Sequence, residues 1–402
     1  MYIARQAIYN RSLKVYGYEL LYRKGNQSEG FDGLSSTRAS ASVLGGLFES
    51  GIYQIVDDKY AFVNFDDELI NSIALELIDP KQLVIEVLET IHVNERLIER
   101  LDFLKNKGYK IALDDFVEDL KSYPLSPYAD IIKFDLIATP LDTISVNIKE
   151  ALLQKKILLA EKVETEGEFQ QAKRMGFHLF QGYYFSKPLL VNESKSHKST
   201  KAQYLRLLNE LKKEEPSYQK LAEIIEKDAN LSYRLIKLSS LRSGTELIYS
   251  IKSALAYMGL NEIERWISIL MLREMNTSKP DELMRISLIR TKFAELISIH
   301  SKYEKLKFSA SIMGLFSVID VMLNQKMVDA LKDIALSTPI TDALLYRKGE
   351  LYPIYKIITV YETGDWEETE KISKDIGIDE KDIFNDYLYA VKWTREIMEE
   401  LK

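Results

Sequence analysis

The sequence of 402 residues contains no cysteine, which excludes disulfide bonds and thiolate metal ligands. It also lacks an uninterrupted apolar run of about 20 residues, and its opening stretch, MYIARQAIYN, has no apolar signal core. Neither charge dominates, since 54 Lys and Arg stand against 61 Asp and Glu, so no broad basic field is available for nucleic acid. We therefore expect a cytoplasmic protein that binds no long nucleic acid and does not insert into a membrane.

The first half of the chain alternates short apolar runs with segments of helical period. Predicted strands lie at residues 14–23, 61–66, 83–89, 110–115, 129–136, 156–164 and 177–185. Between two of them, residues 94–108 carry apolar side chains at helical spacing and end at Gly108, which suits a helix C-terminus. This alternation predicts an α/β domain with a mostly parallel sheet and helices outside it.

Nearly every predicted strand carries polar residues at or near its C-terminal end. They are Glu19, Asn64, Glu86, Asp114, Asp115, Lys133, Asp135, Glu161 and Gln181. Solvent exposure alone would account for polar residues at strand ends, but in a (β/α)8 barrel these ends converge on the face that holds the active site. Most of the set are oxygen donors suited to hard cations, and crowded carboxylates repel one another unless a cation offsets them. The pattern therefore favours a divalent-metal site on a TIM-like barrel.

The same runs resemble the EAL domain, the family that hydrolyses the bacterial messenger cyclic di-GMP. The resemblance rests on YELLYR (18–23), FVNF (62–65), IEVLE (85–89), LDDF (113–116), IKFD (132–135), AEKVET (160–165) and QGYYFSKP (181–188). These segments stand in the order and spacing of the family's motifs over nearly two hundred residues.

The resemblance implies a role for each motif residue. Mg²⁺ or Mn²⁺ would be bound by Glu19, Asn64, Glu86 and Asp115, with Asp114 and Asp135 near a second metal ion. Lys133 would orient the attacking water, Glu161 would be the general base, and Glu89 would anchor the following loop. The nucleotide would be contacted by Gln6, Arg23, Gln181 and Pro188. Two metal ions can together activate a bridging water and stabilise both oxygens of a phosphodiester exchange.

The chain departs from the family pattern beside this site. Where the family continues after Asp-Asp-Phe into a Gly-Thr-Gly-Tyr-Ser-Ser loop, residues 117–124 read VEDLKSYP, without glycine. Because glycine permits backbone shapes that Val117 and Glu118 do not readily adopt, we expect an altered loop and slow hydrolysis. Leu20 replaces the family's Ala, and Lys162 replaces a Gly and places a cation near the site.

The second half of the chain has a different character. Residues 191–202 are polar, as is typical of a linker, and the rest follows a helical period. We expect a barrel domain over residues 1–190, a linker over 191–202 and an all-helical domain over 203–402. The segments DANLSYRLIKLSS (228–240) and IYSIKSALAYMGLNEIERWI (248–267) resemble the HDOD domain, a helical relative of the HD phosphohydrolases.

The helical domain lacks the residues of an HD enzyme. HD enzymes need adjacent His and Asp ligands, and none of the four histidines (His92, His178, His197 and His300) precedes an Asp. We therefore expect this domain to be catalytically inert and to bind protein partners, with a homodimer as a further expectation.

Three functions remain open from the sequence. In the first, the protein hydrolyses cyclic di-GMP to the linear dinucleotide and its helical domain couples this to partners. In the second, the barrel is a sensor that binds cyclic di-GMP or a metal without turnover, and its occupancy changes what the helical domain binds. In the third, the barrel is a ligand-free scaffold for protein contacts. The retained metal ligands favour the first two, and the altered loop favours the second over the first.

Overall fold

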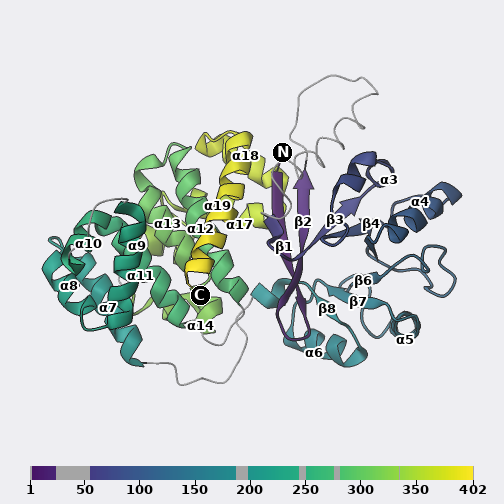
Figure 1. Cartoon of the computed structure of the whole chain (residues 1–402), viewed down its shortest axis with the longest axis horizontal. Helices are drawn as coiled ribbons and strands as arrows, with labels where there is room; N and C mark the ends of the chain where they lie inside the picture. The colour runs from purple at the N-terminus through teal and green to yellow at the C-terminus, as the bar shows by residue number, and fades with distance from the viewer. Residues whose placement is uncertain are drawn as a thin grey trace. The chain divides into compact units, whose positions relative to one another are not determined.

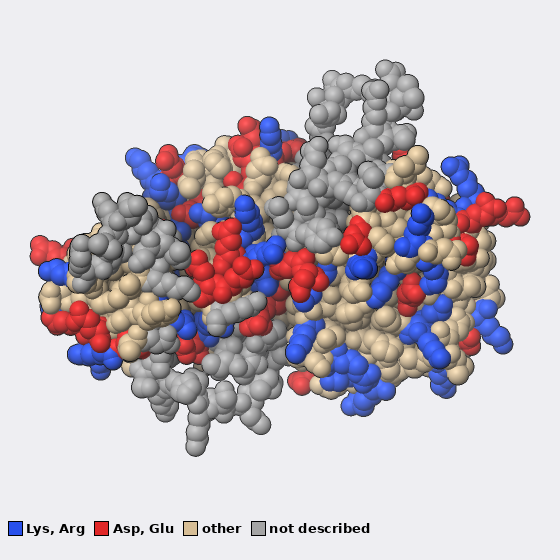
Figure 2. All heavy atoms as spheres, viewed as in Figure 1, with Lys and Arg blue, Asp and Glu red and all other residues tan. Residues whose placement is uncertain are grey.

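The computed structural model describes residues 2–23, 55–186, 198–243, 250–275, 281–334 and 336–401. Packing divides the chain into two compact units, of which the first comprises residues 1–189 and 359–402 and the second residues 190–358. On the face shown in Figure 2, basic and acidic side chains are interspersed over both units, as expected for a chain with nearly balanced charge.

The first unit contains a closed barrel whose strands follow one another in chain order (Figure 1). The strands are β1 (Tyr2–Asn10), β2 (Val15–Arg23), β3 (Tyr60–Phe65), β4 (Leu83–Val87), β5 (Lys110–Leu113), β6 (Ile131–Asp135), β7 (Ile157–Glu161) and β8 (Leu179–Phe180). β1 is antiparallel to both β2 and β8, and all other neighbours are parallel. The predicted TIM-like barrel is therefore confirmed.

Helices follow several of the parallel strands. They are α3 (Asp67–Ile70), α4 (Glu95–Asn106), α5 (Ser145–Leu153) and α6 (Glu166–Met175), with short 3₁₀ turns at Ile73–Leu77 and Tyr183–Ser186. α4 matches the helix predicted over residues 94–108: the Asn94 side chain caps the amide of Leu97 at 2.9 Å. Gly108 follows the helix with a φ of 95°, which glycine adopts without strain.

Strand β1 was missed by the sequence analysis. Its middle residues, Arg5 and Gln6, break the apolar pattern that identifies a strand. Arg5 is nevertheless buried, because its guanidinium lies 4.3 Å from the ring centre of Tyr18 and donates to the carbonyl of Ile55. Cation–π and hydrogen-bond contacts thus allow a charged residue inside this strand.

One apolar layer fills the barrel interior. Its buried members are Ile8, Phe62, Val84, Ala112, Ile131, Leu159 and Leu179, one from each strand except β2. On β2, Gly17 lies opposite Ile8 in the strand register. A Cβ at Gly17 would lie 2.7 Å from the Phe62 ring, so only glycine leaves room for that ring.

The C-terminal helices of the first unit pack on β1. They are α18 (Trp366–Ile376), α19 (Glu380–Glu400) and the part of α17 (Tyr352–Glu362) from residue 359 onward. Tyr2 stacks on Trp366 with ring centres 5.3 Å apart, and the amide of Ile3 donates to the Tyr361 hydroxyl at 3.3 Å. These residues were expected in the helical domain over 203–402, whereas packing groups residues 359–402 with the barrel, because aromatic side chains such as Tyr361 and Trp366 are buried against β1.

The described residues of the second unit form helices joined by turns, with no strand among them. Besides the first part of α17, it contains α7 (Lys198–Leu211), α8 (Tyr218–Ile225), α9 (Ala229–Ser243), α10 (Ile251–Met258), α11 (Leu260–Met275), α12 (Asp281–Ile299), α13 (Lys307–Phe316), α14 (Ile319–Leu323), α15 (Met327–Leu331) and α16 (Thr338–Tyr346). The stretch Glu304–Leu323 is long and apolar enough to cross a membrane by length and composition alone, and 67% of its most apolar 18-residue window is buried inside the structure. Such burial is also typical of a core helix in a globular protein.

Candidate active site

The polar strand-end residues form a second layer directly beyond the apolar layer of the barrel. Residues two positions apart in a strand share one face. The residues that follow a member of the apolar layer by two positions are Asn64, Glu86, Asp114, Lys133, Glu161 and Gln181. On the antiparallel strands, Gln6 precedes Ile8 by two positions and Glu19 lies opposite Gln6. The strand period therefore brings most of the predicted site residues together.

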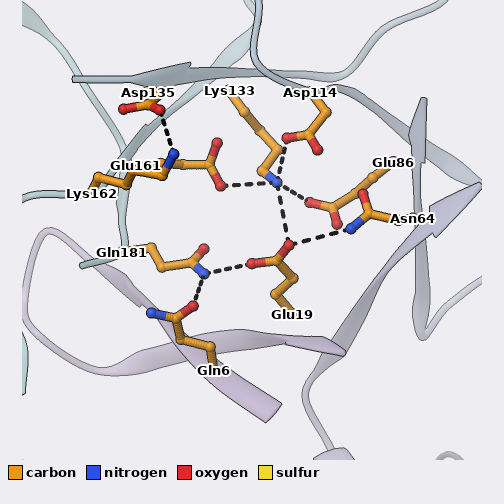
Figure 3. Close-up of polar contacts among 10 residues, drawn as sticks. All are labelled: Gln6, Glu19, Asn64, Glu86, Asp114, Lys133, Asp135, Glu161, Lys162 and Gln181. Carbon is orange, nitrogen blue, oxygen red and sulfur yellow. Dashed lines mark hydrogen bonds and ion pairs between the residues drawn. The ribbon is translucent and has the colours of Figure 1, made fainter. Parts of the chain in front are cut away.

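Lys133 lies at the centre of this layer (Figure 3). Its side chain is fully buried, and its Nζ lies 2.6 Å from Glu86 Oε1, 2.7 Å from Asp114 Oδ1 and 3.0 Å from Glu161 Oε1. Glu19 Oε1 lies further away, at 4.0 Å. A single ammonium thus offsets carboxylates from four strands or strand ends, which is what permits these acids to be buried together.

Side-chain amides hold Glu19 from the other side. Gln181 Nε2 donates to Glu19 Oε2 at 2.6 Å and to Gln6 Oε1 at 2.9 Å. Asn64 Nδ2 donates to Glu19 Oε1 at 3.5 Å. Gln6 is exposed, so the row from Glu19 through Gln181 to Gln6 leads from the buried centre towards solvent.

The buried acids have strongly perturbed proton affinities. Burial, followed by the charges of Glu19 and Asp114, raises the pKa of Glu86 well above its ordinary value, although Lys133 lowers it. Burial likewise raises the pKa of Glu161 to about 8. The carboxylates in turn raise the pKa of Lys133, against the effect of its burial. The cluster therefore holds more acidic groups than its lysine can neutralise, which favours a further cation.

Asp115 and Asp135 lie beside this cluster. Asp115 has a φ of 41°, in the left-handed region, and burial followed by the charge of Asp114 raises its pKa. Asp135 Oδ1 accepts from the amides of Ile137 and Ala138 at 2.8 and 3.3 Å, and Oδ2 lies 2.5 Å from Lys162 Nζ. Burial opposes ionisation of Asp135, but these donors hold its pKa below the ordinary value.

The structure groups Asp114, rather than Asp115, with Glu19, Asn64 and Glu86. Asp114 follows Ala112 of the apolar layer by two positions and shares its face, whereas Asp115 is one residue further on. The strand period could have given this assignment from the sequence. Oxygens of Asp114, Asp115 and Glu161 still lie within 4.8 Å of one another, so Asp115 remains close to the site.

The loop after Phe116 folds without the positive backbone φ angles that glycine favours. None of residues 117–124, all of which the structure describes, has a positive φ. Asn147 of α5 holds this loop, because its Oδ1 accepts from the Leu120 amide at 3.1 Å and its Nδ2 donates to the Glu118 carbonyl at 2.8 Å. Nothing in the sequence pattern marked Asn147, which the sequence analysis missed.

The described contacts assign no role to three predicted residues. Glu89 is exposed and makes no hydrogen bond or ion pair with the described residues, so its role as loop anchor stays a prediction. The backbone of Arg23 pairs with Tyr2 at the end of β2, but its side chain lies outside the description. Pro188 lies outside the described residues altogether.

The donor set fits a hard divalent cation. Asn64 Oδ1 and Glu86 Oε2 are buried, and neither accepts a hydrogen bond from the part of the chain that the structure describes. Buried acceptors without a donor cost free energy unless a ligand supplies one or coordinates them. With Glu19 and Asp114 alongside, they provide the carboxylate and amide oxygens that Mg²⁺ and Mn²⁺ prefer.

Comparisons with known proteins agree with this architecture. The EAL domain family matches residues 61–188, and the HDOD domain family matches residues 199–342. The protein YuxH of Bacillus subtilis is 34% identical over 414 residues, covering 99% of each chain. The cyclic di-GMP phosphodiesterase CdgJ of Vibrio cholerae is 31% identical over 405 residues, covering 98% of this chain and 93% of its own.

Among solved structures, the EAL-domain protein YkuI of Bacillus subtilis, in complex with cyclic di-GMP and calcium, is 21% identical. It covers 64% of this chain and 72% of its own, with a TM-score of 0.38.

The closed barrel with its acidic layer around a buried lysine, followed by an all-helical unit, defines a two-domain protein of the EAL and HDOD type. The end-to-end similarity to two relatives completes this assignment. The chain belongs to the family of proteins in which an EAL domain precedes an HDOD domain.

Proposed function

We propose that this protein is a metal-dependent cyclic di-GMP phosphodiesterase that opens the cyclic dinucleotide to its linear form. The observation that carries the proposal is the polar layer around Lys133. In this layer, buried oxygens of Asn64 and Glu86 accept no hydrogen bond from the described residues and are free to coordinate a cation. The similarity to CdgJ over nearly the whole chain supports the same reaction.

In this proposal Glu19, Asn64, Glu86 and Asp114 hold Mg²⁺ or Mn²⁺. The bound ion would lower the pKa of a coordinated water and stabilise negative charge on the phosphodiester. Glu19 and Glu86 are buried and Asn64 and Asp114 are half-buried, and contacts with Lys133 and with one another hold these side chains in place, so the site is organised before substrate arrives.

Glu161 is the proposed general base, and Lys133 positions it. The pKa of about 8 makes the Glu161 carboxylate a better proton acceptor than an ordinary glutamate. Lys133 Nζ lies 3.0 Å from Glu161 Oε1 and fixes its direction. Gln6 and Gln181, at the outer end of the layer, are placed to contact the nucleotide, and Arg23 and Pro188 keep that role as predictions.

Turnover by this site should be slow. The loop over residues 117–124 is held by Asn147 on α5 rather than by glycine turns, so it does not supply the family's usual loop. Catalytic geometry tolerates little error, since a displacement of about 1 Å can cost about a hundredfold in rate. Restoring a Gly-Thr-Gly-Tyr-Ser-Ser loop after Phe116 should raise turnover more than affinity.

The test is incubation of the purified full chain with cyclic di-GMP and Mg²⁺ or Mn²⁺, with products separated by chromatography and affinity measured in parallel. Glu161→Gln should lower turnover by about 10² to 10⁴ and leave affinity within a few-fold. Glu166→Gln, on the exposed first turn of α6, is the matched control and should match the native rate.

The altered loop favours one alternative, a barrel that binds cyclic di-GMP without hydrolysing it. Tight binding with no linear product in either metal would select this sensor function and reject the phosphodiesterase. If the protein neither binds nor hydrolyses cyclic di-GMP, both functions are rejected. The remaining function is then a ligand-free scaffold for protein contacts.

Protein partners remain part of the proposal for the helical unit. Tyr233 and Ile236 lie three residues apart on α9 and are 66% and 40% exposed, and Tyr257 of α10 is 46% exposed. Exposed apolar side chains on neighbouring helices are typical of protein interfaces. Cytoplasmic location and a homodimer stay predictions within the same proposal.

A further inference from the structure

Lys162 occupies the Asp135 end of the site with a positive charge of its own (Figure 3). Its Nζ lies 2.5 Å from Asp135 Oδ2, and the other Asp135 oxygen already accepts two backbone amides. Both oxygens of Asp135 are therefore engaged by donors within the chain. The charge of Lys162 also acts on Asp115 and Glu161, the other acids on this side.

The backbone around Lys162 is fixed by close packing. Lys162 has a φ of 51°, a conformation that side-chain-bearing residues adopt at a cost. The next amide, of Val163, donates to the Gln181 carbonyl at 3.0 Å. Gly182 packs so tightly here that a Cβ would lie 2.3 Å from Val163 N and 2.9 Å from the Lys162 carbonyl carbon. The backbone that carries Lys162 is thus held by a hydrogen bond and by close packing against Gly182.

We propose that the Lys162 ammonium replaces a divalent cation at the Asp115 and Asp135 end of the site. The chain would then hold a single Mg²⁺ or Mn²⁺ ion, at Glu19, Asn64, Glu86 and Asp114. The inference rests on the metal site of the proposed function and adds the number of ions to it.

Electrostatics and ligand supply both support a single ion. A second divalent ion near Asp135 would have to displace an ammonium from a carboxylate that is only 8% exposed, and would then stand close to that positive charge. The Lys162 side chain itself is 57% exposed, so its replacement should leave the barrel core intact.

The experiment counts Mn²⁺ ions bound to the metal-free full chain, using the electron paramagnetic resonance signal of free Mn²⁺ in a titration. Lys162→Met removes the charge but keeps a long side chain on the same backbone, and should bind one ion more than the native chain. Lys162→Arg keeps the charge and should bind the native number. Asp135→Asn added to Lys162→Met should remove the extra ion, because that ion needs the freed carboxylate.

An equal number of ions in the native and Lys162→Met proteins overturns the inference, as does an extra ion in Lys162→Arg. Linear dinucleotide production is measured on the same samples. A native chain that turns over substrate with two ions overturns this inference and leaves the proposed function standing. If the native chain binds no Mn²⁺ ion and the Lys162→Met protein binds one, the result supports the role of Lys162. The same result rejects the proposed metal site at Glu19, Asn64, Glu86 and Asp114.

Discussion

Replacing Trp366 by alanine tests whether the C-terminal helices are part of the barrel unit. The Trp366 side chain is 8% exposed, stacks on Tyr2 at 5.3 Å and meets the edge of Tyr361 at 5.2 Å. A buried Trp→Ala change costs about 3 to 5 kcal/mol, of which each aromatic pair accounts for about 0.5 to 1.5 kcal/mol. We expect a loss of free energy of unfolding near the lower figure, since Trp366 is not completely buried.

The loss of stability in Trp366→Ala should mainly affect β1. Among the described residues, β1 pairs with β8 only at Tyr9 and Asn10, so its other end depends on β2 and on the helices that cover it. The Ile3 amide donates to Tyr361, the ring that packs against Trp366. Loosening this aromatic cluster should therefore open the beginning of β1 before the rest of the barrel.

Hydrogen exchange measured by mass spectrometry on the full chain would detect this opening. A loss of about 3 kcal/mol corresponds to a fall of about a hundredfold in the protection of β1 amides. Amides of α11 and α12, in the other unit, should keep their protection. Tyr389→Ala removes an aromatic ring that is 53% exposed on α19 and should cost under about 1 kcal/mol. Unchanged β1 protection in Trp366→Ala would refute the assignment of residues 359–402 to the barrel unit.

Three further outcomes follow from other contacts. Gly182→Ala should weaken both folding and metal binding, because its Cβ would lie 2.3 Å from Val163 N; native-like thermal unfolding and Mn²⁺ titration would contradict this. Arg265→Met should cost about 1 to 3 kcal/mol in urea unfolding, because Glu295 loses the guanidinium 2.7 Å away and keeps only the Lys292 ammonium at 2.8 Å; an unchanged stability would contradict it. Burial opposes ionisation of Glu295, but Arg265 and Lys292 lower its pKa. The ionised Glu295 therefore stabilises the folded chain at pH values above the ordinary pKa of glutamate, and this contribution is lost as the pH falls through the lowered pKa. Stability measured against pH should therefore decline in acid for the native chain and less steeply for Arg265→Met.

The sequence predicted the barrel because its strands are short, apolar and spaced by helical segments. It missed β1 because strand recognition depends on an apolar pattern, and Arg5 interrupts that pattern. The compensating contacts of Arg5, with Tyr18 and the Ile55 carbonyl, join residues far apart in the chain and leave no local signal. Tertiary contacts of this kind are where propensity and pattern fail.

The candidate site was predictable to the extent that it follows the strand period. Asn64, Glu86 and Lys133 lie where that period places them, and the same period selects Asp114 over Asp115. The helical tail is the opposite case. A period of 3.6 residues indicates that one face of a helix is buried but not which part of the chain covers it. Residues 359–402 were therefore recognised as helical while their packing on β1 was not.

Two of the differences between this protein and its family lie in the connections between strands, whereas the polar residues at the strand ends are kept. The polar layer around Lys133 depends on strand period and on the apolar layer beneath it, so a change there would disturb the core of the barrel. Residues 117–124 and Lys162 lie outside the strands, where substitutions alter the surroundings of Asp115 and Asp135 without disturbing the apolar layer of the barrel. A chain can in this way keep the residues that bind a cation and change the number of ions and the rate. The departures at the loop and at Lys162 both fall on the same side of the site, which is why the number of bound ions and the turnover should be measured together.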